Sequence, residues 1–268
     1  MPEGDTVWRT ALHLDKALSG QVLLASDFRV PAYATIDLAG RRVVQTVARG
    51  KHLLTRIGKG DDAVTLHTHL KMEGSWHLYR EGTPWRRPAH SARVVLRTAE
   101  WTAVGFSLGV VDVLPSAEEH SVVGHLGPDL LGPDWDLDEA VRRVRAEPER
   151  AVGEAILDQR NVAGIGNMYK SELCFLQGLD PWLPVRDVPD VPALLRQAKR
   201  LLEANKMRTA QATTGDTRRG RQLWVYRRDK QRCRRCGTPI QVAMQGPETQ
   251  DRATYWCPAC QPRTTESR

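Results

Sequence analysis

Apolar residues near the start of the chain recur at the spacing of one helix face. The stripe consists of Val7, Ala11, Leu14 and Leu18. Its period predicts an amphipathic helix over 6–18, with Asp5 or Thr6 as its N-cap and Gly20 as its stop. The chain therefore begins with a helix that has one face to bury.

From residue 21 to residue 108 the pattern changes to short runs in which apolar and polar residues alternate. The runs are QVLLASDFRV, RRVVQTVA, KHLLTRI, AVTLHTHL, SWHLY, ARVVLRT and WTAVGFSL. Gly, Pro and Asp stand between them, which favours an antiparallel sandwich or barrel over a parallel sheet. The stretch VARGKHLL predicts two strands joined by a tight turn with Lys51 at its tip.

A segment rich in Pro, Gly and acidic residues follows and indicates a connection between domains. Helical periodicity then returns in four segments, 136–146, 149–159, 168–178 and 191–206. The predicted fold class is α+β. Its expected parts are a β-sandwich domain at 1–120, a linker at 121–135, a helical domain at 136–223, a cysteine-bearing finger at 224–262 and a tail at 263–268.

Length and composition fit two ordinary domains, because the chain has 268 residues of which 41% are hydrophobic. No run approaches the roughly 18 apolar residues of a membrane span. The first residues also lack the basic, apolar and small-residue succession of a signal peptide. We therefore expect a cytoplasmic protein that does not enter a membrane.

The net charge of +7 is concentrated in one part of the chain. Between Arg196 and Arg235 there are fourteen Lys and Arg against three acidic residues, a local charge of +11 that leaves −4 for the remainder. Such a concentration suits a polyanion, since each neutralised phosphate releases condensed counterions. A solvated basic face is the alternative.

Four of the five cysteines form two CxxC pairs separated by 20 residues. The pairs are Cys233 with Cys236 and Cys257 with Cys260. This is the spacing of a zinc ribbon, in which four thiolates surround one structural Zn²⁺. Disulfides are the alternative, less favoured in a chain without a secretory signal, and Cys174 is expected to be a buried apolar filler.

Two further stretches are candidates for a reactive chain terminus and for a phosphate-binding turn. The chain opens MPEGDTVWR, and removal of Met1 would leave a secondary amine at Pro2 beside the carboxylate of Glu3. In LDQRNVAGIGNMYKSE, Gly164 and Gly166 permit a turn with exposed amides, and Asn167 stands where the next helix would be capped. A helix start of this kind can bind a phosphate. A plain helix-turn-helix corner that binds no ligand would have the same sequence pattern.

Four separated motifs together resemble the formamidopyrimidine-DNA glycosylase and endonuclease VIII family of base excision repair. They are MPEG at the start, RGKHLL in the hairpin, LDQRNVAGIGNMYKSE between two helices and DRATYWCPACQ in the finger. The resemblance spans nearly the whole chain. It implies an N-terminal β-sandwich carrying the terminal helix, a helix-two-turn-helix domain with a zinc finger, and DNA bound in the cleft between them.

The resemblance also implies a bifunctional DNA glycosylase and AP lyase. Pro2 would attack the anomeric carbon, expel the damaged base and form an iminium that drives strand nicking by β,δ-elimination. Glu3 would act as general acid and base. Lys51 would reach the phosphate or the departing group, and Arg252 would grip the phosphates that flank the lesion and assist δ-elimination.

Further DNA contacts follow from the same resemblance. Asn167 and the amides around Gly166 would hold the DNA backbone, and Glu172 matches a family carboxylate near the catalytic proline. The stretch HLKMEG resembles the loop that fills the hole left by a flipped nucleotide, with Met72 as wedge and Lys71 as its neighbour. A further expected contact is made by His125.

Two departures from the family pattern bear on the substrate. Asp5 and Thr6 replace the Pro-Glu pair of many relatives, and the stretch 106–114, FSLGVVDVL, lacks the Asp-x-Arg-x-Phe-Gly pattern of the second filling loop. With PEG in place of PEL, these favour the endonuclease VIII branch and oxidised pyrimidines. The stretch 213–226, TTGDTRRGRQLWVY, is a candidate to close over the flipped base.

The sequence therefore predicts an enzyme that acts on damaged DNA, in duplex, bubble or single-stranded form. We expect a monomer, associated with the nucleoid if the source is bacterial. Two alternatives stay open, a non-catalytic zinc-ribbon DNA-binding protein and the same enzyme acting mainly on oxidised purines. A binder would tolerate an N-terminal extension, whereas the enzyme would lose its covalent chemistry with one.

Overall fold

The computed structural model describes residues 2–247 and 251–263, so Met1 and most of the predicted tail lie outside the described residues. The chain forms two compact units, which divide between His125 and Leu126. This point falls inside the predicted linker, and the predicted domain boundaries themselves stay a prediction. No helix in the described ranges is long and apolar enough to span a membrane.

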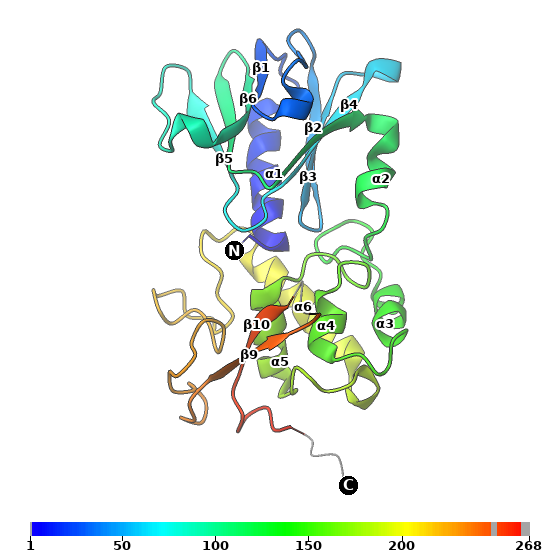
Figure 1. Ribbon diagram of the computed structural model, residues 1–268, viewed down its shortest axis with the longest axis vertical. Coiled ribbons are helices and arrows are strands. Elements are labelled where there is room, and N and C mark those ends of the chain that lie inside the picture. The colour runs from blue at the N-terminus through cyan, green and yellow to red at the C-terminus, as the bar shows by residue number, and fades with distance from the viewer. Residues whose placement is uncertain (1, 248–250, 264–268) are drawn as a thin grey trace. The chain divides into compact units, whose positions relative to one another are not determined.

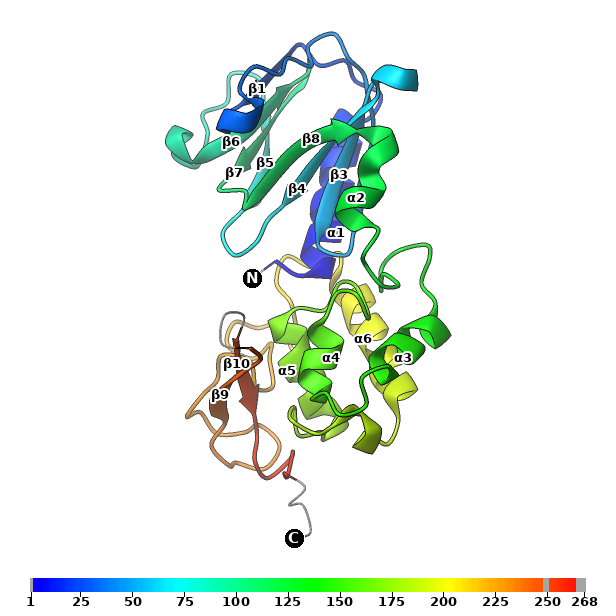
Figure 2. The same cartoon turned by 45° about the vertical axis from the view of Figure 1, so that its right-hand side comes forward.

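The first unit is an antiparallel β-sandwich with a helix at its start (Figures 1 and 2). One sheet has the strand order β1-β6-β7-β5 and the other β2-β3-β4-β8, with every neighbouring pair antiparallel. The strands are β1 (Ala25–Phe28), β2 (Val43–Arg49), β3 (His52–Ile57), β4 (Val64–His69), β5 (Ser75–Arg80), β6 (Ala92–Arg97), β7 (Trp101–Phe106) and β8 (Val110–Pro115). Short helical turns connect them, η1 (Pro31–Tyr33), η2 (Gly60–Asp62), η3 (Ala89–Ser91) and η4 (Ser116–Glu118), and the unit closes with α2 (Glu119–Val123).

Helix α1 (Gly4–Leu18) packs its predicted apolar stripe into the core of this sandwich. Its start differs from the expectation, because Glu3 rather than Asp5 or Thr6 occupies the N-cap position, and the cap makes no side-chain hydrogen bond. The backbone at Glu3 is extended, and its carbonyl accepts from the Val7 amide at 3.0 Å, which begins the helix earlier than the polar residues indicated.

The second unit combines helices with a small β-finger. The helices are α3 (Leu137–Arg145), α4 (Val152–Leu157), α5 (Asn167–Gln177) and α6 (Val191–Asn205), with the short turn η5 (Val185–Asp187). The finger contains the antiparallel pair β9 (Gln241–Gln245) and β10 (Arg252–Trp256). Tyr169 of α5 lies in the helical core, whereas Phe175 of the same helix packs on Cys233 and Cys257 of the finger.

The predicted α+β fold is thereby confirmed, with an antiparallel sandwich, a terminal helix, a helical part and a cysteine finger. Helix α5 is the central element of the second unit, since it is buried along nine of its residues. It carries the predicted Asn167 and Glu172 at its start and middle, and it joins the helical core to the finger.

Candidate active site and nucleic-acid interface

The N-terminal residues are held by the rigid start of α1. The side chain of Glu3 is completely buried and Pro2 is half-buried. Val7 and Leu14 anchor the helix in the core, which leaves residue 2 little freedom relative to the sandwich. A nucleophile at Pro2 would therefore be presented in one orientation, as covalent catalysis requires.

The predicted hairpin with Lys51 at its tip is present. Arg49 pairs with His52 across β2 and β3, so Gly50 and Lys51 form a two-residue turn. Gly50 has a φ of +57°, a conformation that such turns require and that glycine adopts without strain. Helix α1 packs on β2, and Figures 1 and 2 show the N-terminus and the hairpin tip at the same end of this unit.

Histidines gather next to the turn of this hairpin. His52 pairs with His69 in the β3–β4 register, and its Nδ1 lies 2.8 Å from Nε2 of His67. His67 Nδ1 lies 3.0 Å from a carboxylate oxygen of Asp112. The exposed ring of His125 stands edge-on to His52, with centroids 6.2 Å apart.

Burial keeps His52, His67 and His69 neutral near pH 7, because it lowers the pKa of each imidazole. Burial, aided by His69, His67, His125 and Lys51, lowers the pKa of His52 to about 3. Burial, aided by Lys71, Lys51 and His67, lowers the pKa of His69 to about 4. Sequence reasoning singled out only His125. The signal that it missed was a histidine directly after the hairpin turn, His52, together with two histidines at alternate positions of one strand, His67 and His69.

The loop after β4 presents the predicted wedge to solvent. Met72 is 60% exposed, unusual for a large apolar side chain. Lys71 has a φ of +49°, and its amide donates to Nδ1 of His69 at 2.9 Å. The Lys71 stem lies over Gly109, where an added Cβ would come within 2.2 Å of the lysine Cγ. Met72 is therefore held on a structured turn.

In the second unit, the N-cap of α5 lies one residue before its expected position. Gly166 occupies the N-cap position and Asn167 is the first helical residue, which corrects the expected cap at Asn167. The Asn167 side chain is almost buried, and its Nδ2 donates to the carbonyl of Ala253 at 2.8 Å. That bond ties the helix start to β10 beside the exposed Arg252. Two predicted DNA contacts are thus brought together.

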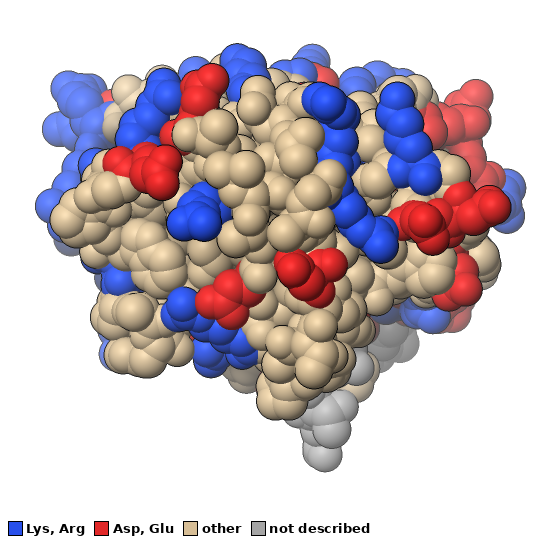
Figure 3. All heavy atoms as spheres, turned by 90° about the horizontal axis from the view of Figure 1, so that it is seen from above, with Lys and Arg blue, Asp and Glu red and all other residues tan. Residues whose placement is uncertain are grey.

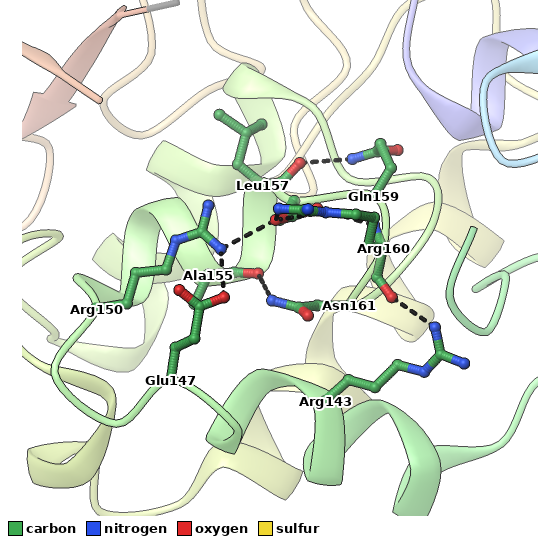
Figure 4. Close-up of polar contacts among 9 residues, drawn as sticks. Arg143, Glu147, Arg150, Ala155, Leu157, Gln159, Arg160 and Asn161 are labelled. Atoms are coloured by element: carbon green, nitrogen blue, oxygen red, sulfur yellow. Dashed lines mark hydrogen bonds and ion pairs between the residues drawn. The ribbon is translucent and has the colours of Figure 1, made fainter. Parts of the chain in front are cut away.

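Side chains brace the turn that precedes α5 (Figure 4). Gln159 donates through Nε2 to the carbonyls of Leu157 and Ile165, at 2.7 and 2.9 Å. Asn161 donates to the carbonyl of Ala155 at 2.9 Å. In an irregular turn, backbone carbonyls lack the hydrogen-bond donors that a helix or sheet would supply. The side chains of Gln159 and Asn161 provide these donors and so hold the stretch between α4 and α5 in place.

A half-buried carboxylate in the same turn, that of Asp158, holds two arginines. Burial raises the pKa of Asp158, but hydrogen bonds from Arg160 and Arg150 outweigh it and hold that pKa well below its usual range. The Oδ2 atom of Asp158 lies 2.6 Å from Arg160 and 3.0 Å from Arg150. The carboxylate therefore stays charged and keeps both arginines in place at neutral pH.

Glu172 is fully buried, and both of its carboxylate oxygens accept hydrogen bonds from other residues of the protein. It accepts from the amides of Trp224, Val225 and Tyr226, each at 2.8 Å, and from the hydroxyl of Thr213. Burial disfavours the charged carboxylate more than these four hydrogen bonds favour it, so the pKa of Glu172 is raised. One side chain thus joins the two ends of the stretch 213–226, the candidate lesion-closing segment.

The four CxxC cysteines converge as the sequence predicted. Their sulfur atoms all lie within 4.8 Å of one another, with 3.9 Å between Cys233 and Cys260 and 3.4 Å between Cys236 and Cys257. Tetrahedral zinc with bonds near 2.3 Å requires sulfur separations of roughly 3.8 Å. The donor set therefore fits a metal ion, whereas Cys174 is buried within α5 and outside this group.

Comparisons with known proteins agree with this architecture. The model of the formamidopyrimidine-DNA glycosylase N-terminal domain matches residues 1–112, and that of the formamidopyrimidine-DNA glycosylase H2TH domain matches residues 126–215. A crystal structure of Lactococcus lactis Fpg with abasic-site DNA has a TM-score of 0.80 at 22% identity, covering 98% of this chain and 100% of that one. At that identity the likeness shows the fold.

Curated relatives are more similar in sequence. A probable endonuclease 8 2 of Streptomyces coelicolor is 57% identical over 264 residues, covering 97% of this chain and 94% of that protein. A DNA-(apurinic or apyrimidinic site) lyase Nei2 of Mycolicibacterium smegmatis is 47% identical over 262 residues, covering 97% and 99%. The chain therefore belongs to the formamidopyrimidine-DNA glycosylase and endonuclease VIII family of bifunctional DNA glycosylases and AP lyases.

Proposed function

We propose that this DNA-repair glycosylase and AP lyase excises oxidised pyrimidines through a Schiff base on Pro2. The observation that carries the proposal is the start of the chain, where Pro2 precedes a fully buried Glu3 at the fixed end of α1. The match to the family's N-terminal domain includes these residues, which supports the proposal.

Pro2 supplies the nucleophile once Met1 has been removed. The lone pair of its secondary amine forms a bond to C1′ of the damaged nucleotide, and the bond from C1′ to the base breaks with its electrons leaving on the base. The amine then loses its proton, and the C1′–O4′ bond breaks as O4′ is protonated, which opens the sugar ring and gives the iminium. This iminium accepts electrons when a C2′ proton is lost and the C3′–O bond breaks. A second elimination at C5′ completes the β,δ sequence.

The other predicted site residues move protons or hold charge. Glu3 protonates and deprotonates groups at the sugar as the ring opens. Lys51 sits at a hairpin tip, where its ammonium can reach a phosphate or the departing group. Arg252 is exposed at the start of β10 and would grip the phosphates beside the lesion.

The remaining residues would hold and fill the DNA. Asn167 and the amide of Gly166 would bind the backbone at the start of α5, where the helix dipole favours a phosphate. Met72 would enter the space of the flipped nucleotide with Lys71 and His125 nearby. We assign Glu172 a positioning role, since it holds the stretch 213–226 and has no exposed surface of its own.

We also propose that the four cysteines hold one structural Zn²⁺. Bound there, the ion would crosslink the residues before β9 to those after β10 and so fix the finger that carries Arg252. The choice of pyrimidines is supported by the endonuclease 8 names of the more identical relatives and by the missing Asp-x-Arg-x-Phe-Gly pattern at 106–114. Oxidised purines are the alternative substrate class.

Borohydride trapping tests the chemistry. Incubation with an oligonucleotide containing an abasic site or an oxidised pyrimidine, followed by borohydride, should give a covalent protein–DNA adduct because the iminium is reduced to a stable amine. A Pro2→Gly variant and an N-terminally extended form should trap poorly. Pro84→Gly, in an exposed loop of the same unit, is the matched control and should trap like the unmodified protein.

The outcomes separate the alternatives. Absence of adduct with both substrates would exclude the Schiff-base proposal and leave the non-catalytic DNA-binding protein. Equal trapping by the extended form would exclude Pro2 as nucleophile. A matched set of duplexes carrying oxidised pyrimidines or oxidised purines would then distinguish the two substrate classes by their initial rates of excision.

A further inference from the structure

Three adjacent strands contribute a hydrogen-bonded chain that the proposed chemistry does not use. Asp112 on β8 contacts His67 on β4, and His67 contacts His52 on β3, at 3.0 and 2.8 Å. The register places these strands side by side, with His67 opposite Asp112. His67 is buried, and the chain ends at His52, next in sequence to Lys51. We name these three residues the Asp112 relay.

Hydrogen-bond chemistry determines the tautomers along the relay. An ionised carboxylate only accepts, so His67 carries its proton on Nδ1 and, when neutral, a lone pair on Nε2. His52 must then donate to that lone pair from its own Nδ1. The Nε2 atom of neutral His52 consequently bears a lone pair, which can take up a proton without breaking either bond of the relay.

The surroundings of His52 are otherwise positive or neutral. The groups that bear on it are Lys51 on the hairpin, His67 and His69 on β4 and His125 after α2. Lys71 lies close to His69, and the Tyr33 hydroxyl is 3.4 Å from Asp112. Among the described residues of this cluster, Asp112 supplies the negative charge, and it acts through His67.

We propose that His52 binds a DNA phosphate as an imidazolium, gaining one proton from solvent as DNA binds, with Asp112 and His67 as positioning residues. A phosphate drawn to Lys51 and Lys71 would add a negative charge in direct contact with His52, which Asp112 reaches only through His67. The new N–H of His52 would donate to a phosphate oxygen. Asp112 would stabilise the imidazolium through His67, as the carboxylate of a Ser-His-Asp triad stabilises its histidine.

This inference rests on the proposed DNA-repair function and predicts a proton-coupled affinity. In the free protein His52 is neutral because its pKa is lowered to about 3. A phosphate and the loss of cationic repulsion both favour the charged form, so the pKa rises in the complex. The affinity for DNA should therefore increase as pH falls toward about 6, by a factor of at most about ten per pH unit for one proton.

Isothermal titration calorimetry tests the proposal directly. The full chain is titrated at about pH 6 with a duplex containing a tetrahydrofuran abasic analogue, in two buffers of different ionisation enthalpy. The difference in heat gives the number of protons taken up. We expect uptake by the unmodified protein, a clear reduction in His52→Gln, and a similar reduction in Asp112→Asn. Asparagine can still accept from His67, so this variant removes the charge while keeping the bond.

His13→Gln is the matched control, since His13 is exposed on α1 and should leave proton uptake unchanged. Binding without proton uptake, or uptake in His52→Gln and Asp112→Asn equal to that of the unmodified protein, would overturn the inference while leaving the DNA-repair function intact. Failure of every protein to bind the duplex would overturn both. If His52→Gln melts at a lower temperature, because a lost imidazole can weaken the hairpin, Asp112→Asn decides the outcome.

Discussion

At the residue scale, Glu172 shows how a sequence motif can single out a residue and leave its task undefined. It stands in the motif that resembles the family, and the resemblance places it near the catalytic proline. Its oxygens accept four hydrogen bonds from the two ends of the stretch 213–226. These partners support the positioning role that we propose for Glu172.

Removal of this carboxylate should destabilise the protein strongly. Glu172→Ala leaves the buried amides of Trp224, Val225 and Tyr226 without a partner, at a cost of about 1–3 kcal/mol for each group. We expect the free energy of unfolding in urea to fall by at least about 3 kcal/mol. The stretch 213–226 should also become more sensitive to proteolysis, because its ends are no longer joined.

Glu147→Ala is the matched control. Glu147 is an exposed carboxylate that pairs with Arg150 at 3.3 Å, and surface changes of this kind cost within about 0.5 kcal/mol. Equal stability of the two variants would show that Glu172 does not hold the loop.

Other residues at this scale were missed. Lys170 is completely buried and donates to Thr254 of β10 at 2.6 Å, so it joins α5 to the finger as Asn167 does. In sequence it is one lysine on a helix, and solvent exposure is the ordinary expectation for that residue type. Only the position of β10 relative to α5 reveals its partner.

At the element scale, the finger depends on two short knuckles and one β-pair. Strands β9 and β10 contribute five residues each, too few for an isolated hairpin to be stable in water. Ile240 and Val225 pack with Phe175 of α5, which gives a small apolar cluster. A metal crosslink between the knuckles would supply the missing stability.

Metal content tests this interpretation of the finger. We expect the purified protein to contain about one zinc per chain, released by a thiol-reactive mercurial and detected with a chromogenic chelator. Cys257→Ala removes one of four ligands and should lose most of the zinc. Cys174→Ala keeps all four ligands and should retain it. Full zinc in Cys257→Ala would contradict a four-cysteine site.

The helices and strands were predicted more accurately than the residues at which they begin. The apolar stripe of α1, the alternating runs of the sandwich and the four helical segments were readable because each reports which local face is buried. The N-cap of α1 was wrong, since the cap lies at Glu3 and makes no side-chain bond that a sequence could signal. The cap of α5 was displaced for a related reason, because glycine takes the extended cap conformation there.

At the scale of the whole molecule, charge is unevenly distributed along the chain. The stretch 196–235 carries a local charge of +11, and the remainder sums to −4. On the face shown in Figure 3, Lys and Arg are interspersed with Asp and Glu, so this face has no large patch of a single charge sign. The basic stretch includes Arg218, Arg219 and Arg221, all exposed within the candidate lesion-closing segment 213–226.

The salt dependence of DNA binding should follow this distribution. Each phosphate neutralised contributes about −0.9 to the slope of log affinity against log salt concentration. Replacing Arg218, Arg219 and Arg221 by Gln should therefore make the slope shallower. The matched control replaces three exposed cations of the first unit, Lys59, Arg80 and Arg97, and should leave the slope unchanged. Equal slopes in the two triple variants would mean that the three arginines of the basic stretch face solvent and do not contact DNA phosphates. Fluorescence anisotropy of a labelled duplex measures the DNA affinity from which both slopes are obtained.

The sequence by itself determined the parts of this protein whose chemistry is local. Pro2 beside Glu3, the Gly50–Lys51 turn and the CxxC pairs are adjacent along the chain, and hydrophobic periodicity reports burial over a single helix or strand. The monomeric state and cytoplasmic location expected from it stay predictions.

Tertiary structure decided the contacts between residues far apart in sequence. The Asp112 relay depends on the register of three strands, and the four bonds of Glu172 depend on how the stretch 213–226 returns to α5. The physical reason is that a buried polar group must find a partner wherever the packed backbone places one, and no local pattern encodes that partner.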